Sequence, residues 1–380
     1  MIRSTVAHID LDAIESNYRT IVSFLESQPR EPGTRPPRVI AVVKANAYGH
    51  GAAPVALALE RAGARMLACA DIEEAVVLRR AGVKAEILVF GALSVSDLDG
   101  LVEYQLTPTI STPTAAASVE ATARRHGVRL RYHLKIDTGM HRLGFRYDNL
   151  KRTLPPLLAS PHLELAAFYT HFATADDPEH PLMDLQRQRF EEASRTLQAL
   201  GVGSALRHAA NSAAILRDAR VWYDFVRPGL LLYGVVPPPL ASTLPLRPAM
   251  SLRSRLVAIK GLRPGDSVGY GARFTADRPC TIGVVPAGYA DGLDLRLTGR
   301  GWVLVGGRRA PIVGAVSMDM ITVDLTGVPA RPGDEVVLLG AQGDTERIDV
   351  REMAAAVGTI PWETLCRVGS RIERIYNSAQ

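Results

Sequence analysis

The chain has 380 residues, of which 47% are hydrophobic and 22% are charged, and its formal net charge is +5. This composition excludes a disordered chain, and the length fits two domains of ordinary size. The longest basic run, Gly306–Arg309, is short, so we expect no nucleic-acid partner. The three cysteines, Cys69, Cys280 and Cys366, lie far apart, so we expect neither structural zinc nor a disulfide framework.

The N-terminal segment Met1–Asp10 has neither the apolar core nor the cleavage pattern of a signal peptide. The chain also has no uninterrupted run of about 18 apolar residues, the length that a membrane-spanning helix needs. We therefore expect a cytoplasmic protein without a membrane span.

Strand-like and helix-like segments alternate over residues 1–240. The strand-like segment Ala7–Leu11 comes first, before a long helix, and we expect it to pair with the second domain. Eight apolar runs follow, at Val39–Val43, Met66–Ala70, Ile87–Phe90, Leu106–Ile110, Leu130–Ile136, Leu163–Tyr169, Leu206–Ala209 and Trp222–Val226. Helical spacing between them, as in Ala115–His126, predicts parallel strands with helical crossovers, and eight such strands favour a (β/α)8 barrel of the TIM type. Periodicity alone leaves a doubly wound open sheet possible.

The pattern changes after a proline-rich segment, Val235–Pro248, where we place the boundary between domains 1–240 and 241–380. Three consecutive prolines, Pro237–Pro239, cannot continue a helix or a central strand. The segments that follow are short, β-branched and separated by glycine and proline: Val257–Lys260, Thr281–Val285, Val303–Val305, Ile312–Val316, Ile321–Val323 and Glu335–Leu339. They predict a mainly β C-terminal domain, either a small barrel or a sandwich.

Polar residues follow the barrel strands where active sites of this fold lie, at the carboxyl ends. They are Lys44 after the first strand, Lys135, Asp137 and Arg142 at and after the fifth, His171 after the sixth, His208, Asn211 and Ser212 at the seventh, and Arg227 and Gly229 after the eighth. Phosphate sites of such barrels form after strands seven and eight, so Ser212 and the backbone around Gly229 are candidates for one. Alternatively, Ser212 only caps the next helix.

Lys44 is the most informative single residue, because it ends the apolar strand Val39–Val43. Desolvation at such a position lowers the pKa of a lysine and frees its amine for a Schiff base. The alternative is a lysine whose stem lies along the barrel rim while its ammonium group reaches water.

Taken together, the motifs resemble those of the alanine racemase family, over nearly the whole chain. In the first domain they are A-V-V-K-A-N-A-Y-G-H-G at Ala41–Gly51, K-I-D-T-G-M-H-R-L-G at Lys135–Gly144, Y-T-H-F at Tyr169–Phe172, H-A-A-N-S-A at His208–Ala213 and V-R-P-G at Val226–Gly229. In the second domain they are G-Y-G-A-R-F at Gly269–Phe274, P-A-G-Y-A-D-G at Pro286–Gly292 and S-M-D at Ser317–Asp319.

The resemblance implies a pyridoxal-phosphate enzyme that interconverts L- and D-alanine and supplies D-alanine for peptidoglycan. Lys44 would carry the cofactor and act as the base for the D-enantiomer, and Tyr270 would serve the opposite face, for the L-enantiomer. Arg227 would face the pyridine nitrogen, with His208 behind it, and His171 would contact the tyrosine and the cofactor region. Since an arginine only donates hydrogen bonds, the nitrogen would stay unprotonated and the ring would be a weaker electron sink, which favours simple racemisation.

The resemblance also implies the remaining site residues and a homodimer. The cofactor, its phosphate in particular, would be bound by Tyr48, Asn211, Ser212, Gly229 and Leu230. Arg142 would reach the substrate carboxylate, and Lys135 aligns with a lysine that can be carbamylated. Met318 and Tyr270 would act at the other subunit's lysine, so each active site would be composite, with supporting residues Asp176, Tyr289 and Asp319.

Three positions depart from the family pattern. Trp362 replaces the usual tyrosine of I-P-Y-E, Ala315 replaces an arginine, and the segment Asp291–Arg296 has one extra residue. These departures leave a serine or broad-specificity racemase of the same fold as the nearest alternative. A decarboxylase of this fold lacks support, because no Cys-Asp pair or glycine-rich phosphate loop is present. A non-catalytic pyridoxal-phosphate carrier is the alternative from another class, and the second domain with Tyr270 argues against it.

Overall fold

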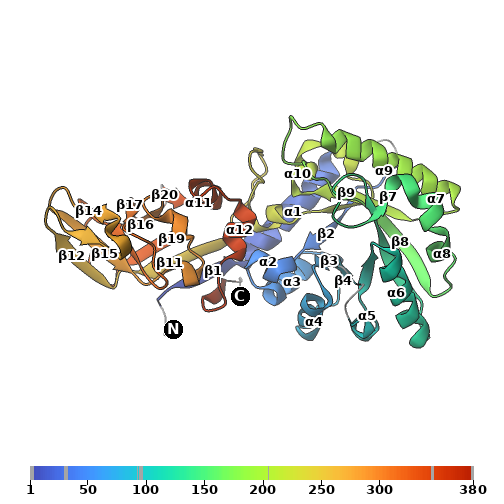
Figure 1. Ribbon diagram of the computed structural model, residues 1–380, viewed down its shortest axis with the longest axis horizontal. Helices are drawn as coiled ribbons and strands as arrows, with labels where there is room; N and C mark the ends of the chain where they lie inside the picture. The colour runs from blue at the N-terminus through green and yellow to red at the C-terminus, as the bar shows by residue number, and fades with distance from the viewer. Residues whose placement is uncertain are drawn as a thin grey trace. The chain divides into compact units, whose positions relative to one another are not determined.

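The computed structural model describes residues 4–29, 33–91, 93, 97–203, 205–343 and 346–377. The chain divides into two compact units. One, here called the barrel domain, comprises 15–47 and 52–246, and the other, the β domain, comprises 1–14, 48–51 and 247–380. Each is described by itself below, and Figure 1 labels their elements.

The barrel domain is a closed ring of eight parallel strands. In ring order they are β2 (Arg38–Val42), β3 (Met66–Cys69), β4 (Glu86–Val89), β5 (Thr107–Ile110), β6 (Leu130–Asp137), β8 (Leu163–Tyr169), β9 (Leu206–Asn211) and β10 (Phe225–Arg227). The ring closes because β5 pairs with β6 and β10 pairs with β2. The two-residue strand β7 (Phe145–Arg146) adds to β6. The predicted barrel is therefore confirmed, and an open sheet is excluded.

Helices connect successive barrel strands. They are α1 (Leu11–Ser27), α2 (Lys44–Tyr48), α3 (Ala52–Arg61), α4 (Ile72–Arg80), α5 (Asp99–Glu103), α6 (Pro113–Arg125), α7 (Leu150–Thr153), α8 (Pro155–Leu158), α9 (Leu182–Ala199) and α10 (Ser212–Arg217), with short 3-10 turns η1 (Tyr147–Asn149), η2 (Ala219–Val221) and η3 (Leu230–Tyr233). Side chains cap several of them: Asp71 accepts from the N–H of Glu74 in α4, and Thr112 accepts from that of Ala115 in α6. Because the strands are covered on both sides, β3 is buried at all four positions.

The β domain is built on one large sheet. Its strand order is β12-β15-β18-β17-β16-β19-β11-β1-β21, with β20 paired to β19. The bounds are β1 (Val6–Asp10), β11 (Met250–Arg255), β12 (Ala258–Leu262), β15 (Cys280–Val285), β16 (Trp302–Val305), β17 (Arg308–Val313), β18 (Ile321–Asp324), β19 (Glu335–Gln342), β20 (Glu346–Ile348) and β21 (Glu373–Asn377). Strand β1 pairs antiparallel with β11 and parallel with β21.

Smaller elements complete the β domain. They are the two-stranded ribbon β13 (Ser267–Val268) and β14 (Phe274–Thr275), the helices α11 (Val350–Ala356) and α12 (Pro361–Cys366), and the 3-10 turns η4 (Tyr270–Ala272), η5 (Tyr289–Asp291) and η6 (Leu295–Leu297). Among the described residues of the whole chain, no helix combines the length and apolar character needed to cross a membrane.

Several details differ from the sequence-based expectation: β13, β14, β20 and β21 had not been predicted, and the strand expected at Trp222–Val226 is β10, Phe225–Arg227. The strand expected at Ile312–Val316 is β17 and ends at Val313, because Gly314 has a φ of 69° and breaks the extended backbone. Strand β11 had not been predicted, although Met250, Leu252 and Ser254 are buried in alternation. The prolines just before it obscured this signal.

Candidate active site

Five of the polar residues predicted at strand ends lie on, or shortly after, barrel strands that are neighbours in the sheet. Lys135 belongs to β6 and His208 to β9, Arg227 ends β10, His171 follows β8, and Lys44 begins α2 directly after β2. Lys135, His208 and Arg227 are buried. Burial lowers the pKa of Lys135 and of His171, and the charges of Arg227 and Lys44 lower both further. The barrel therefore brings these residues within electrostatic reach of one another.

Arg227 is the hub of this centre. Its Nη1 donates to Nδ1 of His208 at 2.7 Å, and its Nη2 donates to Nδ1 of His171 at 3.0 Å. Nη2 also donates to the carbonyls of Thr170 at 2.9 Å and Ala209 at 2.8 Å. Burial lowers the pKa of the guanidinium only to about 10, so it stays charged at neutral pH. Within the described residues, neither its Nε–H nor its second Nη1–H has an acceptor, so the guanidinium keeps donors for a ligand.

Both histidines that face Arg227 are neutral. Burial lowers their pKa well below the ordinary value, and the charge of Arg227 lowers it further. Since Arg227 only donates, Nδ1 of His171 and Nδ1 of His208 must both accept, and each ring carries its proton on Nε2. The centre thus concentrates positive charge on Arg227 alone among these three residues.

Tyr169 forms the platform next to Arg227. Its ring stacks on His208 with centroids 4.4 Å apart, and Nζ of Lys135 lies 4.4 Å from its centroid. Its hydroxyl is hydrogen-bonded to that of Thr109 at 3.2 Å. Burial lowers the pKa of Lys135 well below its ordinary value, and the charges of Arg227 and Arg142 add to this effect. The Lys135 amine is therefore held in conditions that favour its neutral, nucleophilic form.

A phosphorylated anion fits this chemistry. Beyond the effect of burial, the charges of Arg227, Arg142 and Lys44 lower the pKa of Lys135 and of His171, and Asp137 is the one carboxylate among the groups that shift the pKa of Lys135. The carboxylate of Asp137 is already used by the N–H groups of Gly139 and His141, at 3.0 and 3.1 Å. A centre with this excess of cationic groups is suited to an anionic ligand.

Ser212 and Gly229 meet after strands β9 and β10. The Gly229 N–H donates to Oγ of Ser212 at 2.9 Å, and Ser212 is buried. The idea that Ser212 caps the helix is wrong, because the cap of α10 is Asn211, whose Oδ1 accepts from the N–H of Ala214 at 3.0 Å. Leu230 begins η3 beside Gly229. The cap therefore leaves the Ser212 hydroxyl for the loop that carries Gly229.

The turn that follows Lys44 is left-handed. Ala45, Asn46, Ala47 and Tyr48 have φ values of 52–53°, a region that L-residues rarely enter in succession. Side chains stabilise it, since Glu74 accepts from the Ala45 N–H at 2.7 Å and Oδ1 of Asn46 accepts from the Ala52 N–H at 2.8 Å. Tyr48 is buried, and burial raises the pKa of its phenol. Glu74 had not been identified from the sequence, because nothing local marks a partner 29 residues away.

Two further barrel residues from the sequence prediction lie farther out. Arg142 is exposed in the loop after β6, and Asp176 is half-buried after His171. The charge of Arg142 still lowers the pKa of both Lys135 and His171.

In the β domain, two predicted motifs lie side by side because of one glycine. A Cβ on Gly288 would stand 2.3 Å from the carbonyl oxygens of Ser317 and Met318, so only glycine fits. The N–H of Tyr289 donates to the Ser317 carbonyl at 3.0 Å, and that of Ala290 donates to the Met318 carbonyl at 3.1 Å. This backbone pairing places Tyr289 and Met318 on one surface of the domain.

Arg371 stabilises the same surface by hydrogen bonds to two aspartates and to the backbone. Its Nε donates to Oδ1 of the fully buried Asp291 at 2.7 Å, and its Nη1 donates to Oδ1 of Asp319 at 2.9 Å. Its Nη2 also reaches the Met318 carbonyl at 3.3 Å. The predicted side chains themselves stay exposed: 78% for Tyr270, 53% for Met318 and 45% for Tyr289.

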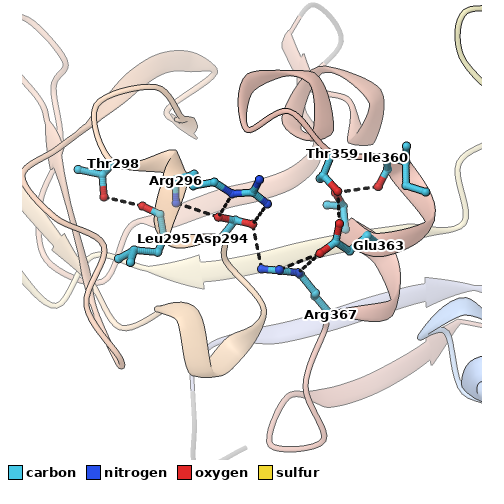
Figure 2. Close-up of polar contacts among 9 residues, drawn as sticks. Asp294, Leu295, Arg296, Thr298, Thr359, Ile360, Glu363 and Arg367 are labelled. Carbon is cyan, nitrogen blue, oxygen red and sulfur yellow. Dashed lines mark hydrogen bonds and ion pairs between the residues drawn. The ribbon is translucent and has the colours of Figure 1, made fainter.

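The segment with the extra residue is anchored on helix α12 (Figure 2). Asp294 accepts from Nη2 of Arg296 at 2.7 Å and from Nη1 of Arg367 at 2.9 Å. Arg367 also donates to Glu363, and Glu363 accepts from the Thr359 hydroxyl. The hydrogen bond from Arg296 and the nearby guanidinium groups lower the pKa of Asp294 to about 2. This network fixes the helix that carries Trp362.

Comparison with known proteins agrees with this arrangement. The family profiles "Alanine racemase, N-terminal domain" and "Alanine racemase, C-terminal domain" match residues 9–237 and 249–376. An alanine racemase of Symbiobacterium thermophilum is 40% identical, over 98% of this chain and 97% of its own. The structure is similar to alanine racemase from D-cycloserine-producing Streptomyces lavendulae, with a TM-score of 0.93, 35% identity and coverage of 100% and 98%. It is also similar to alanine racemase from Bacillus anthracis with bound L-Ala-P, with a TM-score of 0.88, 37% identity and coverage of 100% and 96%.

Proposed function

The chain belongs to the alanine racemase family, and from that premise we propose that it interconverts L- and D-alanine with pyridoxal phosphate bound in the barrel. The observation that carries the proposal is the buried Arg227, which donates to two neutral histidines and keeps its Nε–H for a ligand. The product D-alanine would feed peptidoglycan synthesis.

The barrel offers the groups that would hold the cofactor. Lys44 would bind it covalently, and Arg227 would donate to its ring nitrogen. The phosphate would be bound by Tyr48, Ser212, Gly229 and Leu230, and Asn211 would contribute as the helix cap that leaves Ser212 to this site. When bound, pyridoxal phosphate withdraws electrons from the α-carbon of an attached amino acid and so acidifies its α-proton.

Racemisation requires one base on each face of the α-carbon. Lys44 would take the α-proton of the D-enantiomer, and Tyr270 would take that of the L-enantiomer from the opposite face. Each then returns a proton where the other has removed one, so the configuration inverts. His171, whose Nδ1 accepts from Arg227, would hold its Nε2–H towards the tyrosine side of the site.

Arg227 would limit the chemistry to racemisation. Its pKa of about 10 keeps it protonated at neutral pH, so it donates a hydrogen bond and does not release a proton. A nitrogen that only accepts a hydrogen bond stays unprotonated and withdraws fewer electrons than one paired with an aspartate. The α-carbon is then reprotonated quickly, before side reactions such as transamination compete.

Arg142 would bind the substrate, and Lys135 would support Arg142. Arg142 would pair with the substrate carboxylate. A carbamate on Lys135 would turn a cation into an anion and orient Arg142, and the neutral form that burial favours is the form that reacts with CO2. The exposed residues of the β domain, Tyr270 and Met318, would meet the lysine of a second copy, with Tyr289, Asp319 and Asp176 supporting the entrance.

The deciding experiment is chiral analysis of purified protein with pyridoxal phosphate and either L-alanine or L-serine. Fast conversion of L-alanine with slow conversion of L-serine supports the proposal. Comparable rates would mean that Trp362 and Ala315 widen the substrate range, as in a broad-specificity racemase. Bound cofactor without any conversion would instead indicate a cofactor carrier.

A mixing experiment tests the composite site. Lys44→Ala and Tyr270→Phe proteins, each inactive from L to D, are unfolded together and refolded. If each site uses residues of two subunits, mixed dimers contain one complete site, and up to about a quarter of the native L-to-D activity returns. Without such sharing, the mixture stays inactive.

A further inference from the structure

The buried hydrogen-bond chain behind Arg227 does not end at His208. Nε2 of His208 lies 3.0 Å from Nδ1 of His133, and the ring centroids are 5.1 Å apart. His133 is 1% exposed and belongs to strand β6, two residues before Lys135. Because side chains alternate along a strand, both residues point to the barrel interior. No role in the proposed reaction uses this histidine.

The position of each proton in the chain follows from Arg227. A guanidinium only donates, so Nδ1 of His208 accepts, and the neutral ring then has its proton on Nε2. That Nε2–H donates to Nδ1 of His133, which must accept. The opposite assignment would place two donors, Nη1 of Arg227 and Nδ1–H of His208, 2.7 Å apart. The chain therefore runs in one direction, from Arg227 through His208 to His133.

Among the described residues, His133 is the one hydrogen-bond partner of Nε2 of His208. Burial lowers the pKa of His133 to about 3, so the ring is neutral near neutral pH and its Nδ1 can accept from His208. Without that acceptor, the Nε2–H of the fully buried His208 would lose its partner, which is costly in a protein interior. The His208 ring would then be free to rotate, and Nη1 of Arg227 would lose a fixed acceptor.

We propose that His133 is a positioning residue: its Nδ1 accepts the Nε2–H of His208, holds that ring in one orientation, and thereby fixes the guanidinium of Arg227 for the ring nitrogen of the cofactor. Its influence on turnover rests on the proposed function. The hydrogen bond from His208 to His133 does not, so the two are tested separately.

The test uses the holoenzyme labelled with ¹⁵N-histidine, without substrate. The chain has 9 histidines, and the signals of His133 and His208 are assigned by substitution. We expect both rings to be protonated at Nε2 in the unaltered protein. A His208 ring protonated at Nδ1 would overturn the proposal, whatever the enzyme does with alanine.

Two variants distinguish the effect of the hydrogen-bond acceptor of His133 from the effect of the volume of its ring. His133→Asn places an amide oxygen near the former Nδ1, and we expect an unchanged His208 signal and turnover. His133→Leu removes the acceptor, and we expect the His208 Nε2–H signal to shift and kcat to fall about tenfold at similar KM. Unchanged His208 signal and kcat in His133→Leu would contradict the proposal.

Leu134→Val is the matched control. Leu134 is also buried in β6, but it points to the opposite face of the strand. We expect it to lower the unfolding temperature without moving the His208 signal. If His133→Leu does not fold, the spectrum of the unaltered protein and the rescue by His133→Asn decide the question.

Discussion

The two domains present their candidate residues in opposite ways. In the barrel, Arg227 and His208 are buried and hydrogen-bonded to each other, so folding alone fixes their positions. In the β domain, Tyr270 is 78% exposed and Met318 is 53% exposed, although the backbone beneath Met318 is held by Gly288 and Arg371. The barrel residues are therefore fixed within their own domain, whereas the β-domain side chains remain exposed, as the proposed composite site requires.

Lys44→Ala tests the barrel half of this comparison and has the largest expected effect. Without the amine, the cofactor is no longer bound covalently and one of the two bases is lost, so racemisation falls by about 10⁴-fold or more. Chiral analysis and the absorbance of cofactor retained after dialysis measure both losses. Lys151→Ala, an exposed lysine of α7, should retain both. Normal turnover in Lys44→Ala would remove the lysine from the mechanism.

Tyr270→Phe tests the other part of the comparison, the exposed side chains of the β domain. Removing the phenol should lower L-to-D turnover by about 10²- to 10⁴-fold, the usual contribution of a proton-transfer residue. Because the side chain is exposed, the unfolding temperature and cofactor absorbance should stay unchanged. Retained L-to-D activity would disprove the assignment of the second base.

Ser212→Ala should have a smaller effect, confined to the barrel. Loss of the hydroxyl removes the partner of the Gly229 N–H and one phosphate donor, and we expect cofactor affinity to fall about 10- to 100-fold. Fluorescence titration of the apoprotein measures this. Ser194→Ala, another buried serine whose hydroxyl donates within helix α9, should bind cofactor normally. Equal losses in both variants would show a general packing effect.

The buried histidines predict how stability depends on pH. An unfolded histidine has a pKa near 6.5, whereas that of His133 in the folded protein is about 3. Below pH 6.5 the unfolded chain therefore binds more protons than the folded protein. The contribution of the neutral histidine to the free energy of unfolding is fully present above pH 6.5 and decreases as the pH falls towards 3. The expected slope is about 1.4 kcal/mol per pH unit for each such histidine. Urea unfolding at several pH values measures it.

The control for this slope uses one substitution that removes a buried histidine and one that removes no ionisable group. His133→Asn should reduce the slope by about 1.4 kcal/mol per pH unit, because it removes one such histidine. Leu134→Val, in the same strand, should leave the slope close to that of the unaltered protein. Equal slopes in all three proteins would mean that His133 is not buried in its neutral form.

The strands and the strand-end residues were accessible from the sequence for a simple reason. Apolar runs covered on both faces mark parallel strands, and the carboxyl ends of parallel strands meet, so Lys44, His208 and Arg227 could be placed together without coordinates. His133 could also have been noticed, because it lies two residues before Lys135 in the same strand. A buried histidine in a strand is, however, equally compatible with a purely structural role in the core.

Other parts of the site depend on pairings that no local pattern encodes. Glu74 meets Ala45 only after β2 and α4 have packed, and Arg371 meets Asp291 across 80 residues. Whether Ser212 caps the next helix or serves a phosphate site was also undecidable locally, because serine is suited to both roles. The structure excludes the cap, because Asn211 accepts from the N–H of Ala214.

The left-handed turn after Lys44 makes cofactor attachment a reporter of completed folding. Each L-residue in that conformation costs roughly 1–2 kcal/mol relative to a right-handed turn, so the isolated segment does not adopt it. Contacts from elsewhere must offset this cost, and Glu74 belongs to α4, which follows strand β3. In a chain whose α4 has not docked, Lys44 therefore lies on a segment without a fixed conformation. Lys44 is therefore held in a fixed position only in a barrel in which α4 has docked.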